Sequence, residues 1–375
     1  MVVITGRVRR WQGYHLAAFL FVVCALYGVF AVSGQEHVPN KFYTYVQLCS
    51  VLFMIWEIAR TEHRLRGLLL AFVLGAYLAA LDTVMIYRRD GHSLRRFAAG
   101  GADPNDLAMV LALAIPMAWY IALTARGPVQ RWLGRGYLPL GILAIGLTGS
   151  RGGLVAATVA LTVVPMCMTK LSPGRVVTAL ILLAGSGALA AVYVPEKIVE
   201  RLATTSTEVE DMRLGGRTKF WIAGINAWTQ QPWLGYGTGG FIRAITPQLG
   251  RYVNVAHTSF ISLLVVQGII GLALYLSMIF ATWRAVRRFP FFLERRFGTV
   301  LFTTMITAML PLTWEDQKSV WVVMAVLVGL SHAVVIGRGR TDPAPVRSAG
   351  PPLVGRPVTR RPLGPPVLPG RDAAT

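Results

Sequence analysis

Two arginines and a histidine have side chains and neighbours suited to binding and transferring a phosphate-bearing group. Arg151 is followed by two glycines between two apolar runs, and Arg217 is preceded by two glycines. Glycine lets a ligand approach the backbone closely, and a guanidinium pairs bidentately with phosphate oxygens. His257 precedes another apolar run, and an imidazole suits general acid–base work near neutral pH. These residues indicate anion binding combined with proton transfer.

Each of these residues also has a plain structural explanation. Arg151 and Arg217 could reach the phosphates of lipid headgroups from the membrane boundary. His257 could cap the helix that follows it. Glu315 and Asp316 form an alternative pair of catalytic bases.

Other arginines and two aromatic residues extend the candidate site. A cluster of arginines suits a diphosphate ligand, because the planar guanidinium fork matches phosphate oxygens. The predicted substrate-binding residues are Arg88, Arg213, Arg243, Arg251, Trp221 and Tyr236.

The sequence predicts no cofactor and no metal ion. Glu208, Glu210 and Asp211 form an acidic patch that could hold a divalent cation, but no Asp-x-Asp spacing supports this, and a solvated loop is the alternative. The run Gly235–Gly240 lacks the context of a nucleotide-binding loop or a channel filter. Its backbone must be irregular, so we expect protein or water, and not lipid, to cover it.

The composition indicates that membrane helices position these residues. Of 375 residues, 54% are hydrophobic and only 14% charged, which predicts an all-α polytopic membrane protein. Ten apolar runs are candidate transmembrane helices, two of them short: Tyr14–Ser33, Phe42–Ala59, Gly67–Ile86, Asn105–Leu123, Tyr137–Thr148, Gly152–Met168, Val176–Val194, Thr258–Ala281, Thr299–Leu312 and Ser319–Ile336.

The net charge of +20 reflects how the chain is oriented in the membrane. Alternation of the spans places both termini in the cytoplasm, and most of the surplus Lys and Arg lies in the segments assigned to that side. Because the charge is explained by orientation, nucleic acid is a poor candidate partner. Residues 1–336 form the predicted transmembrane domain, and residues 195–257 form its catalytic outer loop, with a short interfacial helix at Gly216–Gln231. The Pro- and Arg-rich residues 337–375 are expected to be a disordered cytoplasmic tail.

Five motifs in order give the chain a family resemblance. They are Ala102-Asp103-Pro104-Asn105-Asp106-Leu107-Ala108, Thr148-Gly149-Ser150-Arg151-Gly152-Gly153, Gly216-Arg217-Thr218 with Trp221, Pro232-Trp233-Leu234-Gly235-Tyr236-Gly237, and Ala256-His257-Thr258 leading to Gln267-Gly268-Ile269-Ile270-Gly271-Leu272. Over residues 100–280 the chain resembles the O-antigen ligase and polymerase superfamily. It departs from the family at Thr258, where Asn is common, and at Gln267, where an acidic residue is common.

The resemblance implies a GT-C-like membrane glycosyltransferase that needs no metal. It would move a glycan from undecaprenyl diphosphate to a glycan or lipid acceptor at the outer face of the bacterial inner membrane, in contact with membrane lipids. Arg151 and Arg217 would neutralise the leaving diphosphate, and His257 would orient or deprotonate the acceptor hydroxyl.

Three functions remain open on the sequence. The motif set favours a ligase, and a polymerase that joins polysaccharide repeat units shares much of it. A transporter of anionic lipids or polysaccharides would also need outer arginines, but it should show an internal repeat, and none is evident.

Overall fold

The computed structural model describes residues 9–31, 37–90, 96–168, 172–203, 217–250 and 253–341. The chain divides into two units, Met1–Ile336 and Gly337–Thr375. Residues 342–375, which make up most of the predicted tail, lie outside the described residues.

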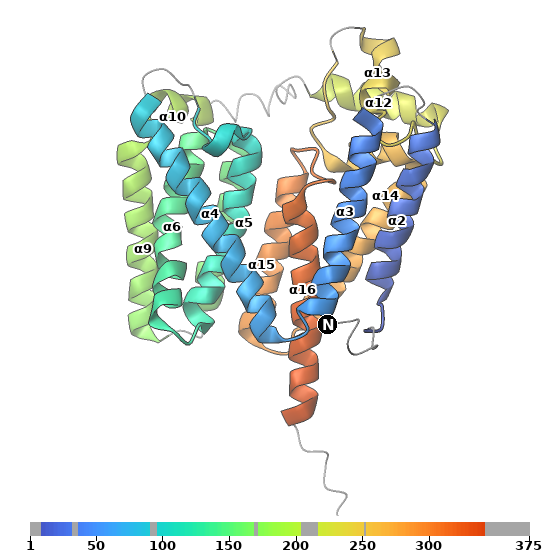
Figure 1. The fold of residues 1–375 in the computed structure, drawn as a ribbon. Helices are drawn as coiled ribbons and strands as arrows, with labels where there is room; N and C mark the ends of the chain where they lie inside the picture. The colour runs from blue at the N-terminus through green and yellow to red at the C-terminus, as the bar shows by residue number, and fades with distance from the viewer. Residues whose placement is uncertain are drawn as a thin grey trace, which may run out of the picture. The chain divides into compact units, whose positions relative to one another are not determined.

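Every regular element in the described ranges is a helix, which confirms the predicted all-α class. The elements, drawn in Figure 1, are α2 (Gly13–Ala31), α3 (His37–Ile58), α4 (Glu62–Asp90), the 3-10 turn η1 (Ala99–Gly101), α5 (Pro104–Thr124), α6 (Pro128–Thr148), α7 (Arg151–Leu161), α8 (Val163–Met168), α9 (Pro173–Tyr193), α10 (Glu196–Ala203), α12 (Thr218–Gln230), α13 (Phe241–Leu249), α14 (Ser259–Arg287), α15 (Phe292–Met309) and α16 (Lys318–Thr341).

Six helices within the described residues are long and apolar enough to cross a membrane, namely α2, α4, α5, α9, α14 and α16. The chain is therefore a polytopic membrane protein. The other four predicted spans also fall on helices, α3, α6, α7 with α8, and α15, but these do not meet the same criterion of length and hydropathy. The number of spans predicted from sequence is thus supported only in part, and the GT-C arrangement stays a prediction.

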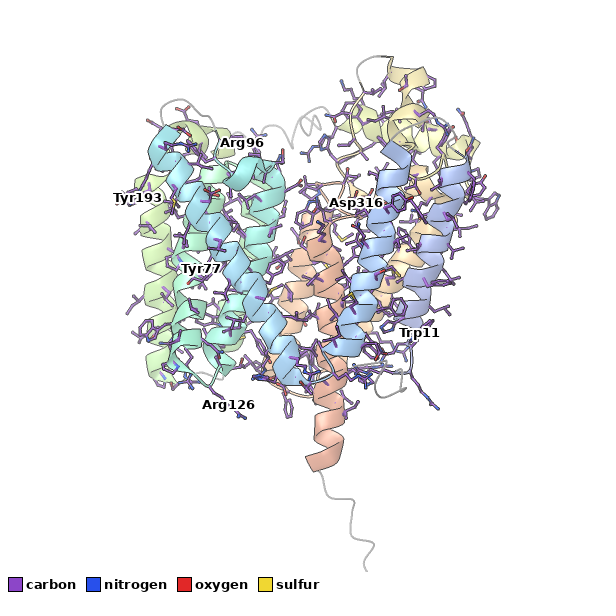
Figure 2. The ribbon with its side chains drawn as sticks, viewed as in Figure 1. Trp11, Tyr77, Arg96, Arg126, Tyr193 and Asp316 are labelled. Atoms are coloured by element: carbon purple, nitrogen blue, oxygen red, sulfur yellow. The ribbon has the colours of Figure 1, made fainter. Side chains whose placement is uncertain are left out.

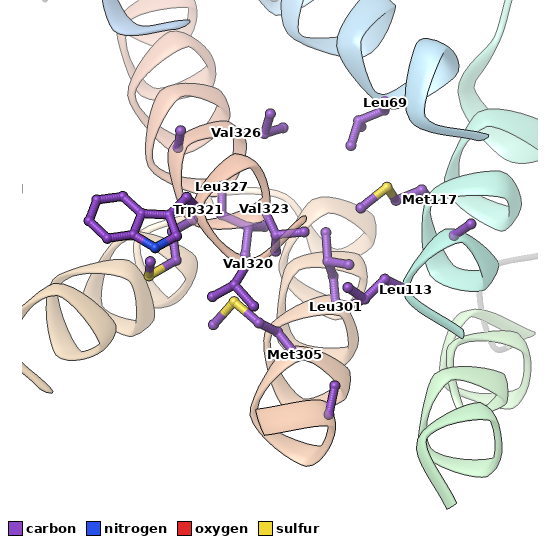
Figure 3. Close-up of a cluster of buried hydrophobic side chains, with 14 of the residues drawn as sticks. Leu69, Leu113, Met117, Leu301, Met305, Val320, Trp321, Val323, Val326 and Leu327 are labelled. Carbon is purple, nitrogen blue, oxygen red and sulfur yellow. The ribbon is translucent and has the colours of Figure 1, made fainter. Parts of the chain in front are cut away.

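Helix α5 lies at the centre of its neighbours. It contacts α4, α6, α7 and α15, and 83% of its apolar window is buried, against 11% for α9. Small residues allow this close packing: a Cβ on Gly134 of α6 would lie 2.4 Å from the carbonyl oxygen of Ala118 of α5. Figure 3 shows Met117 of α5 beside Leu301 of α15 and Leu69 of α4. The core around α5 fixes where its N-terminus lies.

A second group of helices carries the remaining candidate residues. α14 contacts α2, α12 and α15, and α2 also contacts α3. Because α15 contacts both α14 and the pair α5 and α7, it joins this group to the first. Figure 2 shows Arg96 and Asp316 toward the end of the helices where α12 and α13 lie, and Arg126 at the opposite end.

Helix α14 is broken at Gly268, where φ is 64°. The segment of residues 232–240 bonds to the interrupted backbone: the N–H of Tyr236 donates to the Val265 carbonyl at 2.9 Å, and the N–H of Ile269 donates to the Pro232 carbonyl at 2.9 Å. Helix α2 closes the other side, where the Thr238 hydroxyl donates to the Ala25 carbonyl at 2.8 Å. Protein therefore covers the irregular backbone of Gly235–Gly240, where the sequence predicts protein or water and not lipid.

Candidate functional site

Helix α12 is fixed to the segment that carries His257. It runs from Thr218 to Gln230, close to the short helix predicted at Gly216–Gln231, and Arg217 occupies its N-cap position. The indole N–H of Trp221 donates to the carbonyl of Ala256 at 2.7 Å. The residue proposed from sequence as a substrate contact therefore joins Arg217's helix to the residue before the histidine.

His257 has an unusual backbone. Its φ is 50°, and it is the one non-glycine residue with positive φ in the part of the chain that the structure describes. The left-handed region costs a side-chain-bearing residue of order 1–3 kcal/mol, and such strain concentrates at functional sites. Thr258, and not His257, occupies the N-cap position of α14. The capping explanation for this histidine therefore finds no support.

The pKa of His257 is set by burial and by two nearby charges. Burial lowers its pKa, the positive charge of Arg217 lowers it further, and the negative charge of Asp103 opposes both. The pKa therefore falls below the ordinary value of 6.5, and the imidazole is neutral at pH 7. A neutral imidazole can accept a proton.

Arg217 reaches the segment between α15 and α16, residues 310–317, which we call the α15–α16 loop. Its Nη1 donates to the carbonyl of Pro311 at 2.9 Å, and burial lowers its pKa. A half-buried guanidinium acts on a nearby anion through less screening solvent than one at the open surface.

Arg151 starts α7 beside the same proline. Gly149 is left-handed with φ 58°, and Ser150 caps α7 by accepting from the N–H of Gly153 at 3.1 Å. A Cβ on Gly152 would lie 3.2 Å from the ring of Pro311, so the first turn of α7 packs against this ring. The structure thus brings the backbone that follows Arg151 and the guanidinium of Arg217 to one residue.

The α15–α16 loop also holds the start of α14. The Ser259 hydroxyl donates to the Leu312 carbonyl at 3.0 Å and accepts from the N–H of Trp314 at 2.8 Å. The Ser262 hydroxyl donates to Oε1 of Glu315 at 2.7 Å. Sequence reasoning noted Glu315 only as an alternative base and missed the loop as a positioning element.

Glu315 is a buried acid beside a partly exposed ion pair. Burial raises its pKa to about 7, against the opposing charge of Lys41, and the negative charge of Asp316 adds to the rise. Lys41 and Asp316 themselves form an ion pair at 3.5 Å.

The other candidate residues are more scattered. Arg243 donates to the carbonyl of Tyr236 at 3.1 Å, so Arg243 lies beside the glycine run that contains Tyr236. Arg88 is exposed near the end of α4. Arg213, Arg251 and the acidic patch at residues 208–211 lie outside the described residues. Among the described residues, no group of three or more His, Cys, Asp or Glu side chains could hold a metal ion.

Comparison with known families locates these residues in one matched segment. Residues 136–276 match the family model described as O-Antigen ligase. The matched segment runs from α6 into α14 and contains Arg151, Arg217 and His257. No curated protein matches the chain.

Proposed function

We propose that the chain transfers a glycan from undecaprenyl diphosphate to an acceptor, because residues 136–276 match the family model described as O-Antigen ligase. The acceptor is a lipid or glycan, and the reaction takes place at the outer face of the bacterial inner membrane. The observation that carries the proposal is that the Arg217 guanidinium and the first turn of α7 both contact Pro311. The positive charge of Arg217 also lowers the pKa of His257.

The proposed reaction is an inverting displacement. The acceptor hydroxyl attacks the anomeric carbon, its proton passes to the neutral imidazole of His257, and the bond to the diphosphate breaks. Negative charge grows on the leaving diphosphate, and Arg151 and Arg217 stabilise it. The depressed pKa of His257 supports this step, because a base must be unprotonated before the reaction.

The remaining candidates have distinct proposed roles. Arg88, Arg213, Arg243, Arg251 and Tyr236 bind parts of the donor or acceptor away from the reacting carbon. Trp221 acts mainly by joining α12 to Ala256.

The proposed organisation rests on the hydropathy of the chain and on the distribution of its basic residues. Residues 1–336 form the transferase domain, residues 195–257 its catalytic outer loop, and residues 337–375 a disordered cytoplasmic tail. Both termini then lie in the cytoplasm.

The test is a deletion of the gene followed by comparison of carrier-linked and surface glycans with those of the parent strain. Long polymer stranded on the lipid carrier supports the ligase reaction. Single repeat units without long polymer would instead assign a polymerase. An unchanged glycan profile would overturn the proposal.

Complementation tests the residues. His257→Ala and Arg217→Ala should each abolish transfer while the protein still inserts into the membrane. The matched control is Arg126→Ala, at the opposite end of the helices from α12 (Figure 2), which should restore the parent profile. Normal transfer by the first two variants would contradict the assignments.

A further inference from the structure

The turn at the start of α5 is built rigidly from four residues, Asp103–Asp106. The carboxylate of Asp103 caps the helix by accepting from the backbone N–H of Asn105 at 2.7 Å and of Asp106 at 3.3 Å. Pro104 occupies the first helical position, where its fixed φ suits a helix. The buried helix that follows anchors the turn, so its side chains project from a fixed base.

Asn105 holds the connection between α6 and α7. Its Oδ1 accepts from Nη2 of Arg96 at 2.8 Å and from the hydroxyl of Ser150 at 3.1 Å. Arg96 also donates through Nε to the carbonyl of Thr148 at 2.8 Å. The Asn105 oxygen therefore holds Ser150 directly and Thr148 through Arg96, so both neighbours of the left-handed Gly149 are restrained just before Arg151.

Asp106 holds the α15–α16 loop. Its Oδ1 accepts from the indole N–H of Trp314 at 2.8 Å. The backbone N–H of Trp314 donates in turn to Ser259, two residues after His257. The same loop contains Pro311, whose carbonyl binds Arg217.

We propose that the turn Asp103–Asp106 positions the whole active site, with Asn105 setting Arg151 and Asp106 setting His257 and Arg217 through the α15–α16 loop. None of the turn's side chains has to touch substrate in this role, so they are positioning residues. The inference rests on the proposed function for its kinetic consequences, whereas its geometric consequences can be measured without any substrate.

The kinetic test is a double-mutant cycle between Asn105 and Arg151. Asn105→Ala should lower kcat about tenfold or more, with KM changed less than about threefold, because a misplaced Arg151 loses contact chiefly with charge that develops in the transition state. Asn105→Asp keeps the accepting oxygen and should retain most of the activity. In an Arg151→Lys background, Asn105→Ala should lower kcat less than about twofold.

The geometric test is hydrogen exchange of the purified protein in detergent. Asn105→Ala should speed amide exchange in residues 148–153, because Ser150 loses its bond to Asn105, and Arg96, which holds Thr148, loses its bond to the same oxygen. The matched control is Asn226→Ala, which removes the weaker bond between the Asn226 amide and Gln248 at 3.4 Å and should leave residues 148–153 unchanged.

The outcomes separate the two hypotheses. If the parent protein transfers no glycan, the proposed function fails, and exchange in residues 148–153 still decides the positioning role. If the parent is active and Asn105→Ala lowers kcat equally in both backgrounds, the positioning role is overturned. Unchanged exchange in residues 148–153 would overturn it as well.

Discussion

Two irregular segments contact α14, and they are held by different means. The segment of residues 232–240 joins the helix break at Gly268 through backbone groups, with Tyr236 and Ile269 as donors. The α15–α16 loop joins the start of α14 largely through side chains, with Ser259 and Ser262 bonded to it. The glycine-rich segment thus completes a helix, whereas the loop arranges charged and polar side chains around the candidate site.

A segment with a conspicuous composition is therefore not always the one that arranges the candidate site. A glycine run stands out in the sequence, yet the structure uses it for close backbone approach. The α15–α16 loop has an ordinary composition, yet its Pro311 carbonyl binds Arg217 and its Trp314 is bonded to both Asp106 and Ser259. Substitutions in the first segment should therefore affect folding, and substitutions at the second should affect catalysis more than folding.

The largest effect is expected at the helix break. In Gly268→Ala, the new Cβ would lie 2.2 Å from the carbonyl oxygen of Trp233, on a backbone with φ of +64°. We expect destabilisation above about 3 kcal/mol and little folded protein, because neither backbone can move without breaking bonds. The yield of monodisperse protein in detergent and its Tm measure this. Gly187→Ala in α9 is the control, since no atom lies within 4 Å of its added Cβ, and its Tm should not fall.

A smaller structural effect with a larger catalytic one is expected at the loop. Ser259→Ala leaves the N–H of Trp314 and the carbonyl of Leu312 without their bonds to the hydroxyl. The cost is about 1–3 kcal/mol for a buried group left unpaired. We expect a Tm lowered by a few degrees and at least about a tenfold loss of transfer. Ser277→Ala on the exposed part of the same helix is the control, and equal losses in both variants would remove the distinction between the segments.

The sequence predicts the elements better than the contacts between them. Hydropathy located the helices, because apolar runs report the solvent around a segment. The irregular backbone of Gly235–Gly240 implied that protein or water, and not lipid, covers it. The sequence could not pair Asn105 with Ser150, 45 residues apart, because such a bond depends on how α5 and α7 pack. For the same reason the sequence could not show that Arg96 donates to the Thr148 carbonyl.

The acid in the α15–α16 loop gives a pH-dependent stability that the glycine segment lacks. The pKa of Glu315 rises from 4.5 to about 7 on folding, so the folded state retains a proton that the unfolded state releases between these values. Stability should therefore fall as pH rises from about 4.5 to 7 and then level off. Lys41 opposes this rise in pKa, and Asp316 adds to it.

Glu315→Gln tests this stability effect. The amide keeps an acceptor for Ser262 but carries no proton to release, so Tm measured in detergent should vary less between pH 5 and 7 than in the parent. Glu200→Gln, at an exposed site on α10, should keep the parent's dependence. A steeper dependence in the Glu315 variant would contradict the proposed proton uptake.

The smallest effect concerns the charge that Asp103 exerts on His257. If neutral His257 is the base, transfer is lost as pH falls through its pKa, which lies below 6.5. Asp103→Asn keeps a capping oxygen but removes the negative charge that raises this pKa, so the acidic limb of kcat/KM should move to lower pH. Because Asp103 is exposed, solvent screening should keep the shift below about 1 pH unit, and added salt should shrink it. Arg243→Ala, beside the glycine run, should leave the limb in place. A limb that moves to higher pH, or stays fixed at low ionic strength, would show that the charge of Asp103 does not act on the base.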